Sequence, residues 1–157
     1  GSGKGWVSSS YIKIGEKKTS GGGKTSSSGR GDAKLASVSR AVANEMQTTG
    51  WCAKGVNTAI RRHYGYNAYG NGNQVDDYLI SNGNFKKLNY SLNEALSIPG
   101  VIMTWEKTGT TAGQKYGHTA ISQGNGKDST CDFYEYNTNT KSSKRTGFKC
   151  FLHNDYV

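Results

Sequence analysis

The sequence contains too few apolar residues for a large core and no segment long enough to cross a membrane. Apolar residues make up 33% of its 157 positions, glycine fills 22 of them, and no run approaches the roughly 20 apolar residues that a membrane span needs. The length fits one domain with a short appendage. We expect a small core, many loops, stability drawn from tyrosines and tryptophans, and a monomer.

Cysteine and histidine are also few. The three histidines lack the paired spacing of a zinc site, which argues against the common zinc-binding motifs. The three cysteines are an odd set. If Cys52 is a free thiol, Cys131 and Cys150 remain, either as a disulfide in an oxidising compartment or as two buried thiols.

Acidic residues are scarce at the N-terminus. Residues 1–40 contain eight Lys/Arg and two Asp/Glu, whereas residues 41–157 contain twelve and nine. A basic tail attracts polyanions such as nucleic acid, anionic lipid or the acidic polymers of a bacterial wall, or else it is a solvated linker that binds none of them. Because the excess charge lies in the tail and not in an aromatic-rich domain surface, we expect no specific nucleic-acid partner.

Three segments differ in composition. Residues 5–14 begin Gly-Trp-Val and pass through serines to Tyr-Ile-Lys-Ile, which predicts one short strand. This piece resembles the last strand of a bacterial SH3 domain, so we interpret residues 1–14 as the remnant of an SH3-like wall-binding module. Residues 15–32 are almost entirely Gly, Ser, Thr and charged, which predicts a flexible linker. Residues 33–157 then form the main domain.

The main domain is expected to begin with helices. Apolar residues at spacings of three and four predict a helix from Ala33 that ends at Gly50, with Asp32 as its cap. A second helix is expected over residues 52–63. Shorter helices are expected over residues 74–80 and after Ser91, which opens a Ser-x-x-Glu capping box.

Strands follow the helices. They are expected over residues 101–106, 118–123, 131–136 and 147–152. Asn125-Gly126 is a strong hairpin-turn signal between the second and third of these strands. Helices first and antiparallel strands after predict an α+β fold in which N-terminal helices pack on an antiparallel β-sheet.

Cys52 is the residue with the clearest chemical potential. It opens the second expected helix directly after Gly50-Trp51, where unpaired backbone amides, the helix dipole and the nearby Lys54 favour a thiolate. His118 opens an expected strand 66 residues later. A cysteine on a helix and a histidine on a sheet are the nucleophile and the base that papain-like hydrolases bring together. The alternative is a small cysteine buried in the core.

Alternation along the strands places two more polar groups near the histidine. Glu135 and Asn137 share one face of the strand expected after the hairpin turn. If this strand pairs with the histidine strand, Glu135 can accept a hydrogen bond from His118 and orient its ring. Asn137 can support the ring or polarise the substrate carbonyl. The expected catalytic set is therefore Cys52, His118, Glu135 and Asn137.

These motifs resemble the CHAP domain, the cysteine, histidine-dependent amidohydrolase/peptidase of phage endolysins and bacterial wall hydrolases. The resemblance rests on Gly50-Trp51-Cys52, on Gly117-His118-Thr119-Ala120-Ile121 and on Glu135-Tyr136-Asn137, with 17 residues from His118 to Glu135. It implies a papain-like fold of the CHAP and NlpC/P60 type. Trp51 stands where many members have a hydrogen-bonding residue. The calcium loop of some members is absent, so we expect no metal and no other cofactor.

The resemblance implies a secreted or wall-directed enzyme that cleaves an amide bond of bacterial peptidoglycan, as an N-acetylmuramoyl-L-alanine amidase or as a stem or cross-bridge endopeptidase. Trp51, Trp105 and Tyr116 flank the expected site, where they line a groove for sugar or peptide or only pack. Two alternatives remain. One is a catalytically inactive wall-binding module of the same fold, and the other is a secreted cysteine protease or antibacterial toxin.

Overall fold

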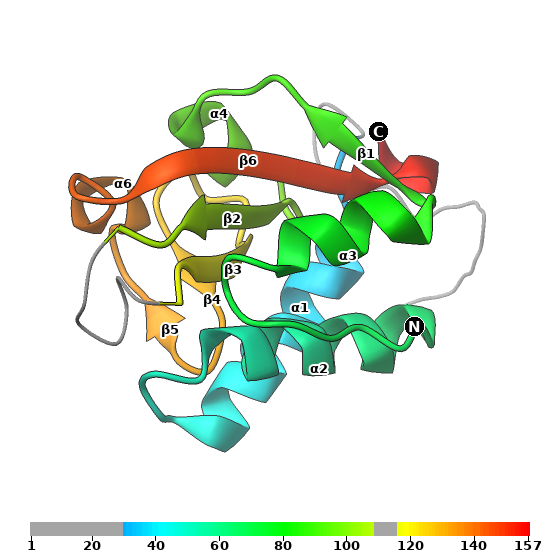
Figure 1. Ribbon diagram of the computed structural model, residues 1–157, viewed down its shortest axis with the longest axis horizontal. Helices are drawn as coiled ribbons and strands as arrows, with labels where there is room; N and C mark the ends of the chain where they lie inside the picture. The colour runs from blue at the N-terminus through cyan, green and yellow to red at the C-terminus, as the bar shows by residue number, and fades with distance from the viewer. Residues whose placement is uncertain (1–29, 109–115) are drawn as a thin grey trace. The chain divides into compact units, whose positions relative to one another are not determined.

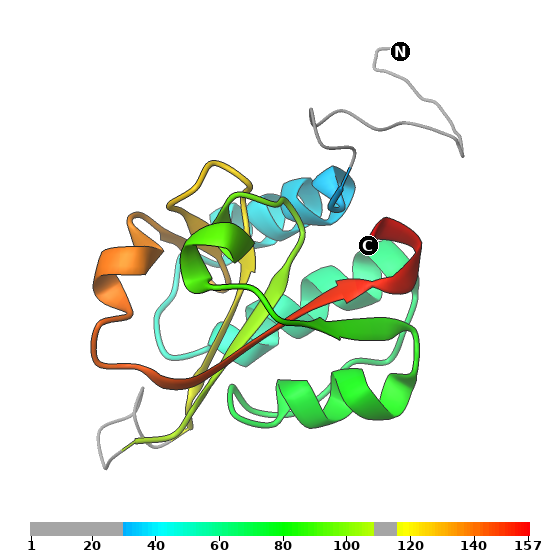
Figure 2. The ribbon, with the colours of Figure 1, turned by 90° about the horizontal axis from the view of Figure 1, so that it is seen from above.

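The computed structural model describes residues 30–108 and 116–157, and Gly31–Val157 form one compact unit (Figures 1 and 2). The SH3-like remnant expected over residues 1–14 and nearly all of the linker expected over residues 15–32 lie outside the described residues. The elements of the described residues are α1 (Ala33–Met46), α2 (Cys52–Tyr64), α3 (Val75–Asn82), β1 (Phe85–Leu88), α4 (Leu92–Leu96), β2 (Ile102–Glu106), β3 (His118–Ser122), β4 (Ser129–Thr130), β5 (Tyr134–Glu135), α6 (Thr138–Lys141), β6 (Thr146–His153) and the 3-10 turn η1 (Asn154–Tyr156).

The described strands form one six-stranded sheet in the order β1-β6-β2-β3-β4-β5, and the neighbouring strands run antiparallel. The long strand β6 lies between β1 and β2, as Figure 1 shows. The chain is therefore an α+β protein with helices packed on an antiparallel sheet, as the sequence predicts. None of the described helices is long and apolar enough to cross a membrane.

Helices cover both faces of this sheet. Ser129 and Thr130 follow one another in β4, so their side chains point to opposite faces. The Thr130 hydroxyl bonds to Ser39 of α1, and the Ser129 hydroxyl bonds to Thr138 of α6 at 2.6 Å. Helices α1 and α6 therefore lie on different faces. Helix α2 packs alongside α1 beneath the sheet in Figure 1.

Helices α1 and α2 form because their apolar residues fall on one side. Leu35 and Val42 of α1 and Val56, Ala59 and Ile60 of α2 are at most 1% exposed. Burying a Leu, Val or Ile side chain stabilises the fold by about 1.5 to 3 kcal/mol.

Several elements begin or end where the sequence does not predict. Helix α1 ends at Met46, and Gln47 takes the left-handed conformation (φ 47°) that closes it before Gly50. Within the strand expected over residues 131–136 only Tyr134–Glu135 is a strand, β5, and a separate short strand, β4, precedes the expected range. Strand β1 was not expected, because Lys86 and Lys87 interrupt its apolar pattern.

The last two residues of the expected linker belong to the compact unit. The Gly31 amide donates to the Tyr156 carbonyl at 3.0 Å, and the Asp32 amide donates to the Pro99 carbonyl at 2.8 Å. The Asp32 side chain caps α1 by accepting from the Leu35 amide at 3.0 Å, as predicted.

Candidate active site

Cys52 is the first residue of α2, and the turn before it is tied to the segment that follows β4. The Trp51 amide donates to Oδ2 of Asp132 at 2.9 Å, and the Thr48 hydroxyl donates to the same oxygen at 3.2 Å. The Thr48 amide also donates to the Asp132 carbonyl at 3.1 Å. A fully buried carboxylate thus fixes the main chain that presents the thiol.

Gly55 allows α2 to lie directly on this segment. A Cβ atom at Gly55 would come within 2.3 Å of the Cys131 carbonyl carbon and oxygen and within 2.5 Å of the Asp132 nitrogen. No other residue fits such a close approach of two main chains. Since Gly55 lies about one helical turn after Cys52, the same contact helps to fix the position of Cys52 relative to the sheet.

The Cys52 sulfur lies against the main chain of β3. Its thiolate form would accept a hydrogen bond from the Thr119 amide, the residue that follows His118. Strand β3 pairs with β4 only at Ile121 and Ser122. The Thr119 amide therefore has no partner in β4 and is available to the sulfur. The sulfur is therefore close to the peptide group that joins Thr119 to His118, the residue that the sequence identifies as the base.

The pKa of the Cys52 thiol is raised above its usual value, contrary to the expectation of a thiolate. Burial is the main cause, and the negative charge of Asp132 adds to it. The amides of Thr119 and Ala53 and the positive charge of Arg145 act in the opposite direction. Lys54 lies instead over the Trp51 ring, 5.6 Å from its centroid. The resting protein therefore carries a protonated thiol.

His118 is half-buried at the start of β3, directly across from Trp105 of β2. The two rings lie 5.4 Å apart between centroids. Burial, together with the charge of Arg145 and against that of Glu135, lowers the pKa of His118 to about 4. Nε2 of His118 is buried and has no hydrogen-bond partner among the residues that the structure describes. The imidazole is thus neutral, packed against Trp105 and without a hydrogen bond at Nε2, which suits a base.

Glu135 lies on the same face of the sheet as His118. Glu135 is opposite Ser129, Ser129 is opposite Ser122, and Ser122 alternates through Ala120 to His118. However, β5 pairs with β4 and not with β3, so a strand separates the two residues. The 2%-exposed Glu135 carboxylate accepts two hydrogen bonds from Arg145, at 3.0 and 2.8 Å.

Asn137 follows β5 in the left-handed conformation (φ 55°) and precedes α6. Its amide donates to Oδ1 of Asp128 at 2.9 Å, and its side chain is exposed. The structure therefore gives Asn137 a clear part in the turn that closes the sheet edge, which leaves its part in chemistry a prediction.

The three aromatic residues expected to line a groove differ in exposure. Trp51 is 59% exposed and Tyr116 is 45% exposed, so both side chains are open to solvent beside Cys52 and His118 in the sequence. Trp105 is only 2% exposed and packs against His118 and Phe148. Its burial fits support of the histidine ring and not the expected contact with substrate. Tyr136, 62% exposed next to Glu135, is a further open aromatic residue.

All three cysteines are free thiols, so Cys131 and Cys150 are the two buried thiols of the alternative interpretation and not a disulfide. Within residues 30–108 and 116–157, no three or more His, Cys, Asp or Glu side chains are grouped to hold a metal ion.

Sequence reasoning missed two charged residues of this site. Asp132 stands between Cys131 and Phe133, where the expected strand hides its turn position. Arg145 lies in a Lys-Ser-Ser-Lys-Arg run that is typical of exposed turns. Only their partners, far away in the sequence, reveal what they do.

Comparison with known proteins supports the fold. The chain aligns with a chain of the crystal structure of the native type VI effector–immunity complex Tae3–Tai3 from Ralstonia pickettii, with a TM-score of 0.55, 20% identity, and coverage of 76% of this chain and 97% of that chain. The selenomethionine form of that complex gives a TM-score of 0.50, 19% identity, and coverage of 74% and 98%. At these identities the likeness shows the fold alone. No protein-family model and no curated protein matches the sequence, so the resemblance to the CHAP domain stays a prediction.

Proposed function

We propose that this protein is a cysteine amidohydrolase that cleaves an amide bond of bacterial peptidoglycan, with Cys52 as nucleophile and His118 as base. The proposal is supported by the position of the Cys52 sulfur at the amide of Thr119, the residue that follows His118, and by the buried Nε2 of His118, which lacks a partner among the described residues. A buried imidazole nitrogen without a hydrogen-bond partner is uncommon in proteins, and a role in proton transfer accounts for it.

The protonation states favour general-base chemistry. Because the pKa of Cys52 is raised and that of His118 is about 4, thiol and imidazole are both neutral in the resting protein. As the sulfur attacks the amide carbonyl carbon, its proton passes to His118. The first-turn amide of Cys52 is a donor for the developing oxyanion.

His118 then returns the proton to the leaving amine nitrogen as the C–N bond breaks, which leaves a thioester on Cys52. A water molecule attacks the thioester carbonyl, His118 accepts the water proton, and the C–S bond breaks. His118 gives this proton to the departing sulfur and ends neutral, and the new carboxylic acid releases its own proton to solvent as a free carboxylate. Glu135 and Asn137 are proposed to support the ring and the substrate, and Trp51 and Tyr116 to border the bound chain.

Peptidoglycan is the substrate class that agrees with both independent indications. The sequence motifs resemble wall hydrolases, and the fold is shared with a chain of a type VI effector–immunity complex. The second indication favours the toxin form of the same chemistry, in which a dedicated immunity protein blocks the enzyme in the producing cell. Under this form the enzyme acts on the wall of a rival cell.

The test is digestion of purified peptidoglycan sacculi by the full chain and by Cys52→Ala. We expect the wild type to release soluble fragments and the variant to release none, with both proteins folded by circular dichroism. Mass spectrometry of the fragments separates an amidase, which frees the lactyl carboxylate, from an endopeptidase, which exposes a new peptide terminus. Equal release by the variant would refute the thiol mechanism.

A further inference from the structure

Arg145 is a charged residue at the centre of the candidate site that the proposed mechanism does not use. It immediately precedes β6, and its side chain is 22% exposed. Its guanidinium donates to both carboxylate oxygens of Glu135, and Nη1 also donates to Oγ of Ser142 at 2.9 Å. Two parallel hydrogen bonds of this kind fix the plane of a carboxylate as well as its position.

The same guanidinium lies on the Trp105 ring. Its central carbon is 5.1 Å from the ring centroid, within the range of a cation–π contact. Trp105 in turn packs against the His118 ring from the neighbouring strand. One side chain therefore contacts the indole that packs on His118 and the carboxylate whose charge acts on His118.

Arg145 also acts on both reacting groups through its charge. The positive charge favours the ionised form of Cys52 and the neutral form of His118. At the thiol this charge opposes the effects of burial and of Asp132, whereas at His118 it acts in the same direction as burial. A cation that only neutralised the buried Glu135 would not need to lie where its charge acts on both Cys52 and His118.

We propose that Arg145 is a positioning residue of the thiol site, whose guanidinium holds the Glu135 carboxylate and the Trp105 ring in the arrangement that sets the His118 imidazole for proton transfer. The inference rests on the proposed function. It assigns no contact with substrate to Arg145, which acts through its neighbours.

The experiment compares Arg145→Gln and Arg145→Lys with a matched control. Arg62 makes the same two-bond pair with Glu45, at 3.0 and 2.9 Å, but on the surface, where the two side chains are 48% and 57% exposed. Arg62→Gln removes an equivalent arginine–glutamate pair away from the site. Two readouts are needed: release of fragments from sacculi, and the rate at which iodoacetamide alkylates Cys52 from pH 6 to 10.

For Arg145→Gln we expect turnover to fall about 10- to 100-fold, as for a slightly misplaced catalytic group, and the alkylation midpoint to move to higher pH. Arg145→Lys retains the charge but cannot hold both oxygens, so the alkylation profile should stay near wild type while turnover still falls. Arg62→Gln should match wild type in both readouts.

Wild-type turnover and an unshifted alkylation profile in folded Arg145→Gln would overturn the proposal. If Arg145→Gln does not fold, Arg145→Lys decides: wild-type turnover in it overturns the role of the paired hydrogen bonds, and reduced turnover with unshifted alkylation supports it. If wild-type protein releases nothing from sacculi, the proposed function fails. A shift in alkylation in Arg145→Gln but not in Arg62→Gln would still support the link between Arg145 and the thiol.

Discussion

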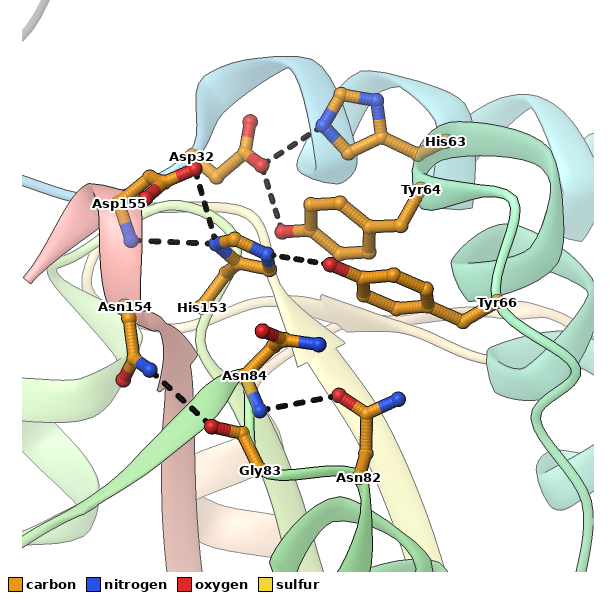
Figure 3. A network of polar contacts seen from close by, with 10 residues as sticks. All are labelled: Asp32, His63, Tyr64, Tyr66, Asn82, Gly83, Asn84, His153, Asn154 and Asp155. Atoms are coloured by element: carbon orange, nitrogen blue, oxygen red, sulfur yellow. Dashed lines mark hydrogen bonds and ion pairs between the residues drawn. The ribbon is translucent and has the colours of Figure 1, made fainter.

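The two ends of helix α2 carry similar side chains in opposite states. At its C-terminal end, Asp32 accepts hydrogen bonds from His63 at 2.8 Å and from the Tyr64 hydroxyl at 2.7 Å (Figure 3). It also accepts from the Leu35 amide. At its N-terminal end, Oδ1 of Asp132 and Nε2 of His118 are buried without a partner among the described residues. Both ends contain a buried carboxylate and a histidine. At the C-terminal end these groups have hydrogen-bond partners, so we call it the saturated end, and we call the N-terminal end the unsaturated end.

The saturated end extends to the last strand. In Figure 3 both nitrogens of His153 are engaged, with Nε2 bonded to the Tyr66 hydroxyl at 2.9 Å and Nδ1 accepting from the Asp155 amide at 3.2 Å. Tyr64 stacks on the His153 ring with centroids 4.7 Å apart. This network joins the start of α1, the end of α2 and the end of β6, so its role is structural.

The difference shows how to separate a structural histidine from a reactive one. A fully bonded imidazole in an aromatic stack contributes to stability and has no vacant position for a substrate proton. A buried imidazole with a free nitrogen costs stability, typically about 1 to 3 kcal/mol for an unsatisfied polar group, and is retained where chemistry uses it. Substitutions at the two ends should therefore affect different properties.

Replacing one histidine from each end gives the largest contrast. We expect His118→Ala to lower turnover on sacculi about 1,000-fold, because a positioned base contributes about 10²- to 10⁴-fold, and to leave the urea midpoint nearly unchanged. His153→Ala should lower the urea midpoint and leave the turnover of folded protein intact. Paired kinetic and urea-denaturation measurements test both, and the reverse pattern would show that the two ends have been assigned the wrong roles.

The carboxylates give the next contrast. Asp32→Ala leaves the His63 and Tyr64 groups without their buried acceptor and removes the cap of α1, so we expect unfolding to become easier by about 3 kcal/mol. Glu45→Ala, which breaks an exposed pair with Arg62, is the control and should leave the urea midpoint nearly unchanged. Equal losses in urea denaturation would mean that the Asp32 network contributes no more than a surface ion pair.

The sequence predicts much of the N-terminal end of α2 and little of its C-terminal end. Cys52 at a helix start and His118 at a strand start follow from local patterns, and the structure places both there. Asp32 is predictable as a cap, but not as the acceptor for His63, because that contact depends on how α1 and α2 pack. No local signal links residues 31 positions apart.

The third member of the site shows a different limit. Alternation puts Glu135 on one face of its own strand, and the register of the sheet, through β4, makes this the face of His118. Alternation cannot reveal that the chain turns at Asp132 and inserts β4 between the two strands, nor that Arg145 binds Glu135. Strand pairing and ion pairs are decided by tertiary packing, which outweighs the local pattern.

Acid should weaken the saturated end in a defined way. Burial alone would raise the pKa of Asp32, but the hydrogen bonds from His63, Tyr64 and the Leu35 amide lower it below its usual value of 3.8. A carboxyl with a lowered folded pKa contributes stability above its unfolded pKa and loses it as pH falls through the folded value.

The difference in unfolding free energy between wild type and Asp32→Asn should therefore be constant above about pH 5 and shrink below about pH 4. Urea denaturation at a series of pH values measures it. A difference that stays constant down to pH 3 would contradict a lowered pKa at Asp32.

The smallest effect is expected at Asp132, where the unsaturated end is adjusted by charge. Asp132→Asn keeps a carbonyl oxygen that can accept from the Trp51 amide and the Thr48 hydroxyl, but it removes the negative charge that helps to raise the pKa of Cys52. The thiol should therefore ionise at lower pH, and the midpoint of its alkylation by iodoacetamide should move down by under about one pH unit. The variant should fold, because the turn before α2 retains its anchor. An upward shift would mean that Asp132 promotes ionisation of the thiol, which would contradict the proposed effect of its charge on Cys52.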